Sequence, residues 1–380
     1  MGNITLIATA AMGLEALVAR EIRDLGYECE VDNGKVTFQG DESAICRSNL
    51  WLRTADRIKI KIGEFRATTF DELFEKTKAL PWGDYIPEDA EFPVVGKSVK
   101  STLFSVSDCQ SIVKKAIVEK MKSTYKRTTW FEENGPLYRI QVSLLKDVAT
   151  LTIDASGIGL HKRGYRIGQG EAPLKETLAA ALVMLTNWKP DFPFVDPLCG
   201  SGTIPIEAAL IGQNIAPGFN REFAANKWGW IPQEKWDLAY EEAEDKANYD
   251  QPLHIMGSDI DHRLVEIATD NAREAGFTDL ISFKQMQVKD FTTKEDYGYV
   301  VTNPPYGERL SEKSMVEQLY KDMGNVFRNY PTWSVYVVTN HEKFETYYGR
   351  PASKKRKLFN GMIRTDYYQY FGVRPPKHKE

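Results

Sequence analysis

The chain has 380 residues, of which 42% are hydrophobic and 27% charged, a composition typical of a globular protein with room for two or three domains. The densest apolar run, 178–185, is eight residues long, whereas a bilayer span needs roughly 20, so the composition excludes a membrane-spanning protein. The N-terminus does not read as a signal peptide, and the four cysteines lie far apart. We therefore expect a reduced, cytoplasmic protein with no membrane partner and no metal site.

Charge is distributed unevenly along the chain. The formal net charge of −4 argues against indiscriminate binding to nucleic acid. Between 97 and 127, however, eight Lys and Arg residues stand against two acids, and a second cluster occupies 354–357. Such patches suit a polyanionic ligand that is also recognised by shape, but a solvated helix face and an ordinary basic loop give the same pattern.

Residues 1–64 read as a small ferredoxin-like α/β unit. The stretch 3–8 alternates like a strand, and 14–25 carries apolar residues at helical spacing. Asn33-Gly34 then predicts a tight hairpin turn between two short strands.

A second α/β region is expected over 65–156. Its centre is a helix over 109–121, capped by Ser107-Asp108, and paired strands follow within 138–153. With its 105–110 segment and basic helix, this region resembles a THUMP domain, an RNA-binding module of RNA-modifying enzymes.

From 157 to 380, strand and helix patterns alternate as in a doubly wound α/β sheet. Strands are predicted at 192–198, 254–260, 280–286, 299–302 and 334–339, and helices at 173–185, 203–211, 263–275 and 315–330. A terminal antiparallel hairpin turns at Asn360-Gly361. An aromatic-rich insertion at 214–253 either covers the ligand cleft or packs outside it, and packing is slightly favoured.

A glycine turn follows the first of these strands. Asp196 precedes Gly200 and Gly202, which let the backbone approach a ligand where a Cβ would clash. Pro205 stands where the dinucleotide fingerprint needs its third glycine, and no Gly-Lys-Ser/Thr phosphate loop is present. The turn resembles the S-adenosylmethionine (SAM) motif of class I methyltransferases. That resemblance assigns SAM contacts to Asp196, Pro197, Cys199, Gly200, Ser201, Gly202 and Thr203.

Two further acids end the next two strands. A carboxylate at Asp259, beside Ile260, is placed to accept hydrogen bonds from ribose hydroxyls, while Asp261 caps the following helix. Asp290 is placed to accept a hydrogen bond from an adenine amine, or is another helix cap or loop acid. We expect Asp259, Ile260 and Asp290 to complete the cofactor site.

Asn303-Pro304-Pro305-Tyr306 follows the fourth strand, at the edge where α/β sheets bind ligands. The Asn303 oxygen and the Pro304 carbonyl can each accept one hydrogen of a planar exocyclic amine, which turns the nitrogen lone pair toward a methyl donor. Tyr306 offers a face on which a flipped base stacks. We predict these four residues to be catalytic, by positioning and without a metal.

Cations in two stretches are candidates for RNA contact. Residues 159–166 include His161, Lys162, Arg163 and Arg166, which either bind RNA phosphates or pin the domain interface. The predicted RNA-binding set is Lys97, Lys100, Lys114, Lys115, Lys122, Lys162, Arg163 and Arg166.

These motifs together resemble the RNA guanine-N2 methyltransferase family in its bacterial 23S rRNA branch, across essentially the whole chain. The resemblance implies a THUMP region followed by a class I (Rossmann-like) SAM-dependent methyltransferase domain, with S-adenosylhomocysteine (SAH) as product and structured RNA, above all rRNA, as partner. The larger rRNA enzymes of this family carry a second methyltransferase module that this sequence lacks, so a tRNA guanine is an alternative target. Asn-Pro-Pro-Tyr also occurs in adenine-N6 enzymes, and a catalytically silent RNA-binding assembly factor is the non-enzyme alternative.

Overall fold

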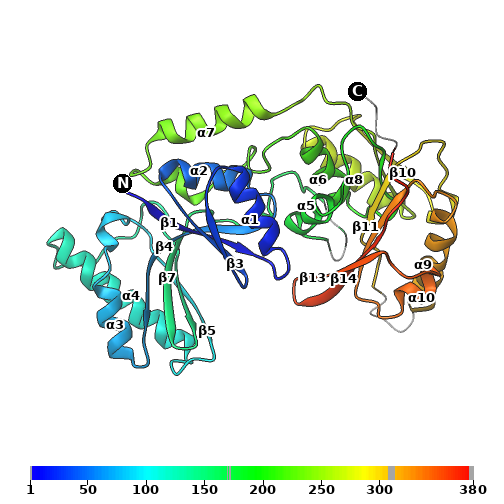
Figure 1. Cartoon of the computed structure of the whole chain (residues 1–380). Coiled ribbons are helices and arrows are strands. Elements are labelled where there is room, and N and C mark those ends of the chain that lie inside the picture. The colour runs from blue at the N-terminus through cyan, green and yellow to red at the C-terminus, as the bar shows by residue number, and fades with distance from the viewer. Residues whose placement is uncertain (1, 169, 171–172, 307–312, 376–380) are drawn as a thin grey trace. The chain divides into compact units, whose positions relative to one another are not determined.

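The computed structural model describes residues 2–168, 170, 173–306 and 313–375. They form two compact units, each with a seven-stranded sheet and each assembled from separate stretches of the chain (Figure 1). The first unit takes in the described residues of Met1–Ala10, Val18–Leu160 and Arg221–Glu242, and the second takes in the rest. The expected boundary at 156/157 lies close to the change of unit after Leu160, while Ala11–Leu17 and Arg221–Glu242 each belong to a different unit from the residues that flank them in sequence.

The first unit is built on a sheet in the order β2-β3-β1-β4-β7-β6-β5. All neighbouring strands are antiparallel except the parallel pair β5 and β6. The strands are β1 (Ile4–Ala10), β2 (Cys29–Asp32), β3 (Lys35–Gly40), β4 (Ala55–Arg66), β5 (Val94–Val99), β6 (Ile140–Leu145) and β7 (Val148–Asp154). Because β4 spans the boundary predicted at 64/65 and pairs with both β1 and β7, one continuous sheet serves both N-terminal regions.

Helices of this unit include α2 (Glu42–Trp51), α3 (Phe70–Lys78) and α4 (Val106–Tyr125), with short 3-10 turns at η1 (Trp82–Asp84) and η2 (Ala224–Lys227). Helix α4 begins earlier than predicted, with Ser105 as its N-cap, so the cap assigned to Ser107-Asp108 was wrong. The buried stripe runs through Cys109, Val113, Ala116, Ile117 and Met121. Two helices, α1 (Glu15–Asp24) and α7 (Gln233–Lys246), cross a unit boundary along the chain.

The middle of the aromatic insertion, Arg221–Glu242, belongs to the first unit. Trp228 is buried, stacks on Tyr138 with ring centroids 4.6 Å apart, and donates from its indole N–H to the Leu137 carbonyl at 3.0 Å. Phe223 and Trp236 stack on each other in the same core. These contacts agree with the favoured interpretation, in which the insertion packs.

The second unit has a doubly wound sheet in the order β10-β9-β8-β11-β12-β14-β13. Strands β8 to β12 are parallel, and β14 pairs antiparallel with β12 and β13. The strands are β8 (Phe194–Asp196), β9 (Ile255–Asp259), β10 (Ile281–Gln285), β11 (Tyr299–Thr302), β12 (Ser334–Thr339), β13 (Lys354–Asn360) and β14 (Ile363–Tyr370). The expected parallel sheet and terminal antiparallel hairpin are both present.

Alternating side chains bury both faces of this sheet. Phe194 and Val301 join a cluster with α5 (Glu176–Met184) and α6 (Thr203–Gly212), whereas their neighbours Val195 and Val300 join one with α9 (Lys313–Phe327) and α10 (Phe344–Tyr348). The remaining elements of this unit are α8 (His262–Glu274) and η3 (Val288–Asp290). No helix in the described part of the chain has the length and hydropathy to cross a bilayer.

The strand order also fixes where a ligand can enter. From central β8 the chain adds β9 and β10 on one side, then crosses over to β11 and β12 on the other. Such a reversal leaves a crevice beyond the carboxyl ends of the two strands that flank it, here β8 and β11. Asp196 ends β8, and Asn303 directly follows β11.

Candidate active site

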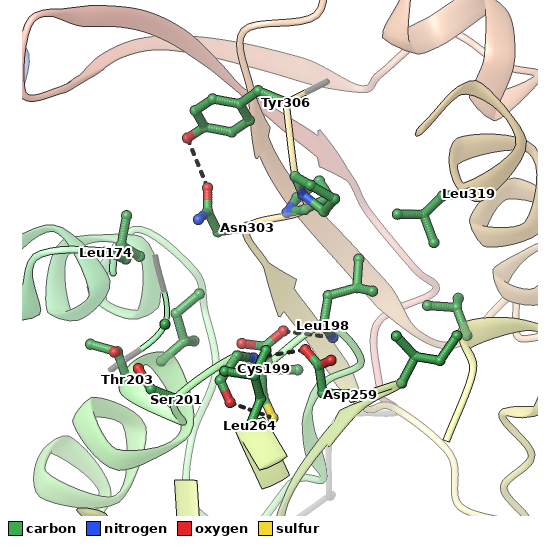
Figure 2. Close-up of a pocket in the computed structure, with 18 of the residues that line it drawn as sticks. Leu174, Leu198, Cys199, Ser201, Thr203, Asp259, Leu264, Asn303, Tyr306 and Leu319 are labelled. Carbon is green, nitrogen blue, oxygen red and sulfur yellow. Dashed lines mark hydrogen bonds between the residues drawn. The ribbon is translucent and has the colours of Figure 1, made fainter. Parts of the chain in front are cut away.

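A cavity of about 750 Å³ lies at these strand ends (Figure 2). Its volume is within the range of small-molecule and cofactor sites. The lining draws on residues 170 and 173–174 and on four further stretches of the second unit, within 196–204, 259–264, 286–289 and 303–306. Further residues come from α9 and the β13–β14 hairpin. Most residues predicted for the cofactor, and all four predicted as catalytic, therefore meet in one cavity.

The glycine turn opens onto this cavity, and glycine is required at its two positions for different reasons. Gly200 has a φ of +53°, and a Cβ there would point into open space. Gly202 has a φ of +82°, and a Cβ there would lie 2.9 Å from Ala268 of α8. Gly202 is therefore needed for packing of the turn against α8, and its contact with the cofactor stays a prediction. Pro197 is buried, and neither Pro197 nor Gly202 lines the cavity.

Asp196 is enclosed at the end of β8. Its Oδ1 accepts hydrogen bonds from the Thr302 hydroxyl at 2.7 Å and from the Leu198 N–H at 3.2 Å, which joins β8 to β11 across the switch point. Burial raises the pKa of this carboxyl to about 7, although both hydrogen bonds act to lower it, and nearby Asp259 raises it further. Asp196 can therefore change its charge near neutral pH.

Asp259 ends β9 and anchors the glycine turn. Its carboxylate accepts the Gly200 N–H at 3.1 Å and the Asp261 N–H at 3.0 Å, one on each oxygen. Each oxygen keeps a second lone pair, which can receive ribose hydroxyls. Asp261 is the N-cap of α8 and accepts the Arg263 N–H, as predicted. Ile260 is exposed and lines the cavity.

Asp290 lies at the edge of the site. The cavity is lined here by 286–289, and the exposed Asp290 follows directly but does not line it. Its assignment to an adenine amine stays a prediction.

The Asn303 turn carries an internal hydrogen bond that its sequence does not reveal. The Tyr306 hydroxyl donates to the Asn303 Oδ1 at 2.8 Å, drawn as a dashed line in Figure 2. The Pro305 carbonyl accepts from the Tyr320 hydroxyl of α9 at 3.2 Å, while the described residues place no hydrogen-bond donor on the Pro304 carbonyl. Two acceptors of the turn, the Asn303 Oδ1 and the Pro305 carbonyl, are thus engaged by described residues, whereas the Pro304 carbonyl is not.

Asn360, at the end of β13, was missed by the sequence reasoning. It lines the cavity, and its side-chain amide donates to the Tyr306 hydroxyl at 3.4 Å. The only signal in the sequence was the Asn-Gly turn, which we interpreted as a turn and nothing more.

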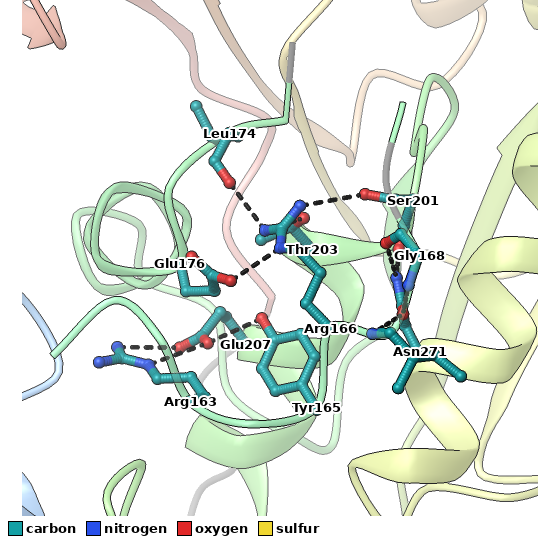
Figure 3. Close-up of polar contacts among 11 residues, drawn as sticks. Arg163, Tyr165, Arg166, Gly168, Leu174, Glu176, Ser201, Thr203, Glu207 and Asn271 are labelled. Carbon is teal, nitrogen blue, oxygen red and sulfur yellow. Dashed lines mark hydrogen bonds and ion pairs between the residues drawn. The ribbon is translucent and has the colours of Figure 1, made fainter. Parts of the chain in front are cut away.

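The two arginines predicted to contact RNA are enclosed within the second unit (Figure 3). Arg163 pairs with Glu207 at 3.3 Å, and both side chains are buried; Tyr165 also donates to Glu207 at 3.0 Å. Arg166 pairs with Glu176 at 2.8 Å. Because buried guanidiniums held by carboxylates cannot reach RNA phosphates, the RNA assignment of Arg163 and Arg166 was wrong.

Arg166 instead fixes the glycine turn. Its guanidinium donates to the Thr203 hydroxyl at 3.0 Å, to the Ser201 hydroxyl at 3.3 Å and to the Leu174 carbonyl at 2.9 Å. All three acceptor residues line the cavity. Helix α5 begins only at Glu176, so Pro173 is not its first residue and lies instead in the cavity wall.

Asn271 of α8 is a second positioning residue that the sequence did not reveal. Its side-chain amide donates to the Ser201 and Gly168 carbonyls, both at 3.0 Å, while its oxygen accepts the Ile167 and Gly168 N–H groups. All of its polar capacity is used to hold 167–168 against the glycine turn (Figure 3).

The remaining predicted RNA contacts differ in exposure. Lys114 pairs with Glu133 at 2.6 Å and covers the Phe92 ring, so it is committed to the fold of the first unit. Lys97, Lys100, Lys115 and Lys162 are exposed, and half-buried Lys122 lies over the exposed Trp130 ring. Apart from Lys114, these lysines stay candidates.

Comparison with known proteins agrees with this geometry. Residues 163–369 match the RMKL-like methyltransferase domain family, 5–59 match the RlmL ferredoxin-like domain, and 67–154 match the THUMP domain. The chain therefore belongs to the RMKL-like methyltransferases that carry an N-terminal ferredoxin-like and THUMP region.

Three relatives illustrate the similarity. YpsC of Bacillus subtilis (strain 168), named as an RNA methyltransferase by inference, is 67% identical over 381 residues, covering 100% of this chain and 99% of that one. A crystal structure described as a predicted N6-adenine-specific DNA methylase from Listeria monocytogenes str. 4b F2365 is 64% identical, with a TM-score of 0.95 over 98% of this chain and 97% of that one. SMU.472, a methyltransferase by inference that was solved with SAH, is 50% identical, with a TM-score of 0.95 over 98% and 99% of the two chains.

SAM is thus the cofactor and SAH its product, and the cavity suits both. Gly200 leaves open space beside the turn, and Asp259 keeps free lone pairs at the end of β9. Ser201 and Thr203 are held by Arg166 at the start of α6, whose first N–H groups have no partner within the helix. SAM supplies an electrophilic methyl group.

Proposed function

We propose that the chain transfers the SAM methyl group to the exocyclic N2 amine of a guanine in structured RNA, with 23S rRNA as the substrate. The observation that carries the proposal is the Asn303 turn at the switch point, in the same cavity as the SAM-binding turn. The RNA assignment is supported by the THUMP match and by the name of the Bacillus relative.

Asn303 and Pro304 would act on the amine. The nitrogen of a guanine amine is planar because its lone pair is delocalised into the ring. Two acceptors, the Asn303 Oδ1 and the Pro304 carbonyl, would each take one hydrogen and favour a tetrahedral nitrogen whose lone pair faces the methyl donor. The Asn303 oxygen has a second lone pair beyond the one used by Tyr306, so the internal hydrogen bond orients the amide and leaves an acceptor.

Tyr306 would hold the base. Its hydroxyl is bonded to Asn303 and receives the Asn360 amide, so the ring is held at the cavity wall. A held aromatic ring stacks on a flipped base at less cost than one free to rotate.

The experiment uses RNA from a strain that lacks this gene. The purified full-length protein is incubated with this RNA and methyl-labelled SAM, and the nucleosides are separated by mass spectrometry after digestion. Label in N2-methylguanosine from the 23S fraction supports the proposal, while label in N2-methylguanosine only from tRNA would move the substrate to tRNA.

Adenine N6 is the second candidate, because the Asn303 turn presents the same acceptors to any exocyclic amine and the Listeria relative is described as an N6-adenine DNA methylase. Label in N6-methyladenosine, or transfer to unmethylated DNA but not RNA, would replace the guanine proposal. If the chain were an RNA-binding protein without activity, it would bind RNA, but calorimetry would detect no binding of SAM.

A further inference from the structure

The β13–β14 hairpin has two faces with different chemistry. Strand pairing places Asn360 opposite Ile363 and Leu358 opposite Thr365 on one face. The other face carries Phe359 opposite Arg364 and Lys357 opposite Asp366. Because side chains alternate along a strand, each face continues to the tip of the hairpin.

The first face reaches the cavity. Leu358 and Thr365 are buried and anchor the hairpin in the second unit. The last pair on this face, Asn360 and Ile363, lines the cavity where the Asn303 turn lies, and Asn360 donates to Tyr306. The tip of the hairpin is therefore fixed beside the place proposed for the target base.

The tip itself is apolar and uncovered. Met362 is 97% exposed, more than any other large hydrophobic side chain described. It follows Gly361, whose φ of +62° makes the tight turn that projects it. A methionine side chain held in solvent contributes no buried apolar surface to the fold.

The flanks of the tip are cationic. Residues 354–364 contain Lys354, Lys355, Arg356, Lys357 and Arg364 and no acid. Lys355 pairs with Glu345, and Arg356 donates to the Gly13 carbonyl. Lys357 and Arg364, on the outer face near the tip, have no ion pair among the described residues.

An apolar side chain between two cations, next to the cavity that contains the Asn303 turn, is an arrangement with which proteins separate stacked bases. Such wedges are inserted between base steps while cations contact the adjacent phosphates. An enzyme acting on the amine of a stacked base must first take that base out of its helix.

We infer that the β13–β14 hairpin opens the RNA at the target nucleotide, with Met362 filling the space that the flipped base leaves. Asn360 and Ile363 form the wall against which the flipped base is held, and Lys357 and Arg364 contact the phosphates on either side. This inference rests on the proposed RNA activity and adds to it how a paired base reaches the Asn303 turn.

The test compares two RNA oligonucleotides built around the target guanine, whose position is found by primer extension on the RNA methylated in the strain experiment. In one, the guanine is paired within a stem; in the other, the opposite nucleotide is abasic, so the guanine has no pairing partner. Single-turnover rates at saturating SAM are measured for wild type, Met362→Ala, Met362→Leu and the control Leu280→Ala, whose exposed side chain precedes β10 at the opposite edge of the sheet.

Met362→Ala should slow transfer to the paired guanine by roughly tenfold, because no side chain then fills the space that the flipped base leaves in the stack. The rate on the unpaired guanine should change by less than about twofold. Met362→Leu should retain most of the paired rate. A stem with 2-aminopurine at the target position should gain fluorescence when wild type and SAH are added, and much less with Met362→Ala. Leu280→Ala should match wild type in every assay.

Equal losses on both RNAs, or wild-type behaviour of Met362→Ala on the paired stem, would overturn the wedge while leaving the proposed function intact. If wild type methylated neither the cellular RNA nor the oligonucleotides, the proposed function would fail, and the wedge with it.

Discussion

Two groups of cations, one in each unit, have opposite surroundings. Lys97, Lys100 and Lys115 of the first unit are exposed, whereas Arg163 and Arg166 of the second are enclosed with Glu207 and Glu176. An enclosed guanidinium with a carboxylate partner organises its own domain and cannot reach a phosphate. An exposed lysine adds little to folding and is available to RNA. The role of each cation therefore depends on whether the fold brings a carboxylate to it.

Arg163 gives the largest expected effect. Arg163→Met should lower the free energy of unfolding by about 3–5 kcal/mol, because Glu207 would remain buried without its cation. Urea unfolding of the full-length protein measures the loss. The double variant Arg163→Met/Glu207→Gln should be less destabilised than the single one, since the neutral amide can still accept from Tyr165. A single variant that unfolds like wild type but binds RNA more weakly would return Arg163 to the RNA surface.

A variant of the partly buried Asn303 tests whether a polar side chain of the cavity activates the amine. Asn303→Ala should lower the single-turnover methylation rate by roughly two to three orders of magnitude, the scale of one preorganised polar contact, and leave SAH affinity unchanged. Tyr306→Phe keeps the ring and removes only the hydrogen bond to Asn303, so its loss should be smaller. Near wild-type transfer by Asn303→Ala would exclude amine activation by this turn.

The sequence predicts the second unit better than the first because the doubly wound sheet is a local pattern. Its parallel strands, the terminal hairpin and the positions of Asp196, Asp259 and Asn303 all follow from strand ends and turn residues. The exchange of Arg221–Glu242 into the first unit was not predictable, since it depends on contacts such as that of Trp228 with Tyr138, far apart in sequence. For the same reason, the partners of Arg163, Arg166 and Asn271 appear only in three dimensions.

A variant of Arg166 tests whether an enclosed cation increases cofactor affinity by positioning the glycine turn, without contacting the cofactor. Arg166→Lys keeps the charge beside Glu176 but cannot reproduce the donors to Ser201, Thr203 and Leu174. SAH affinity by calorimetry should fall by about 1–3 kcal/mol. The control Arg273→Lys, an exposed arginine paired with Asp270 on α8, should leave SAH affinity unchanged. Equal affinities for both variants would contradict a positioning role.

The lysines of the first unit should respond to salt. Replacing Lys97, Lys100 and Lys115 together by Ala should weaken RNA binding and reduce the slope of log K against log salt by about 0.7–0.9 for each phosphate that these lysines neutralise in wild type. SAH affinity and unfolding should not change. Filter binding at several salt concentrations measures the slope, and a triple Ala variant of the exposed Lys189, Lys227 and Lys284 is the control. The same slope in both triple variants would show that Lys97, Lys100 and Lys115 do not form the RNA-binding surface.

Asp196 should give the smallest effect, a proton released on cofactor binding. Burial raises the pKa of this carboxyl from its ordinary value of 3.8 to about 7, so the neutral form is favoured in the folded protein. The contribution of this neutral form to stability is fully present below about pH 4 and is lost as pH rises toward 7. The sulfonium and ammonium charges of SAM favour the ionised carboxylate. Binding near neutral pH should therefore release a fraction of a proton, and affinity should rise between pH 6 and 8.

Calorimetry in two buffers of different ionisation enthalpy measures the proton released by Asp196. The matched variant is Asp196→Asn, whose amide oxygen still accepts from Thr302 and Leu198 but cannot titrate. It should bind SAM without releasing the proton, and its affinity should stay level between pH 6 and 8. The same proton release in both proteins would assign the titration to another group, because Asp196 is then neutral or ionised throughout.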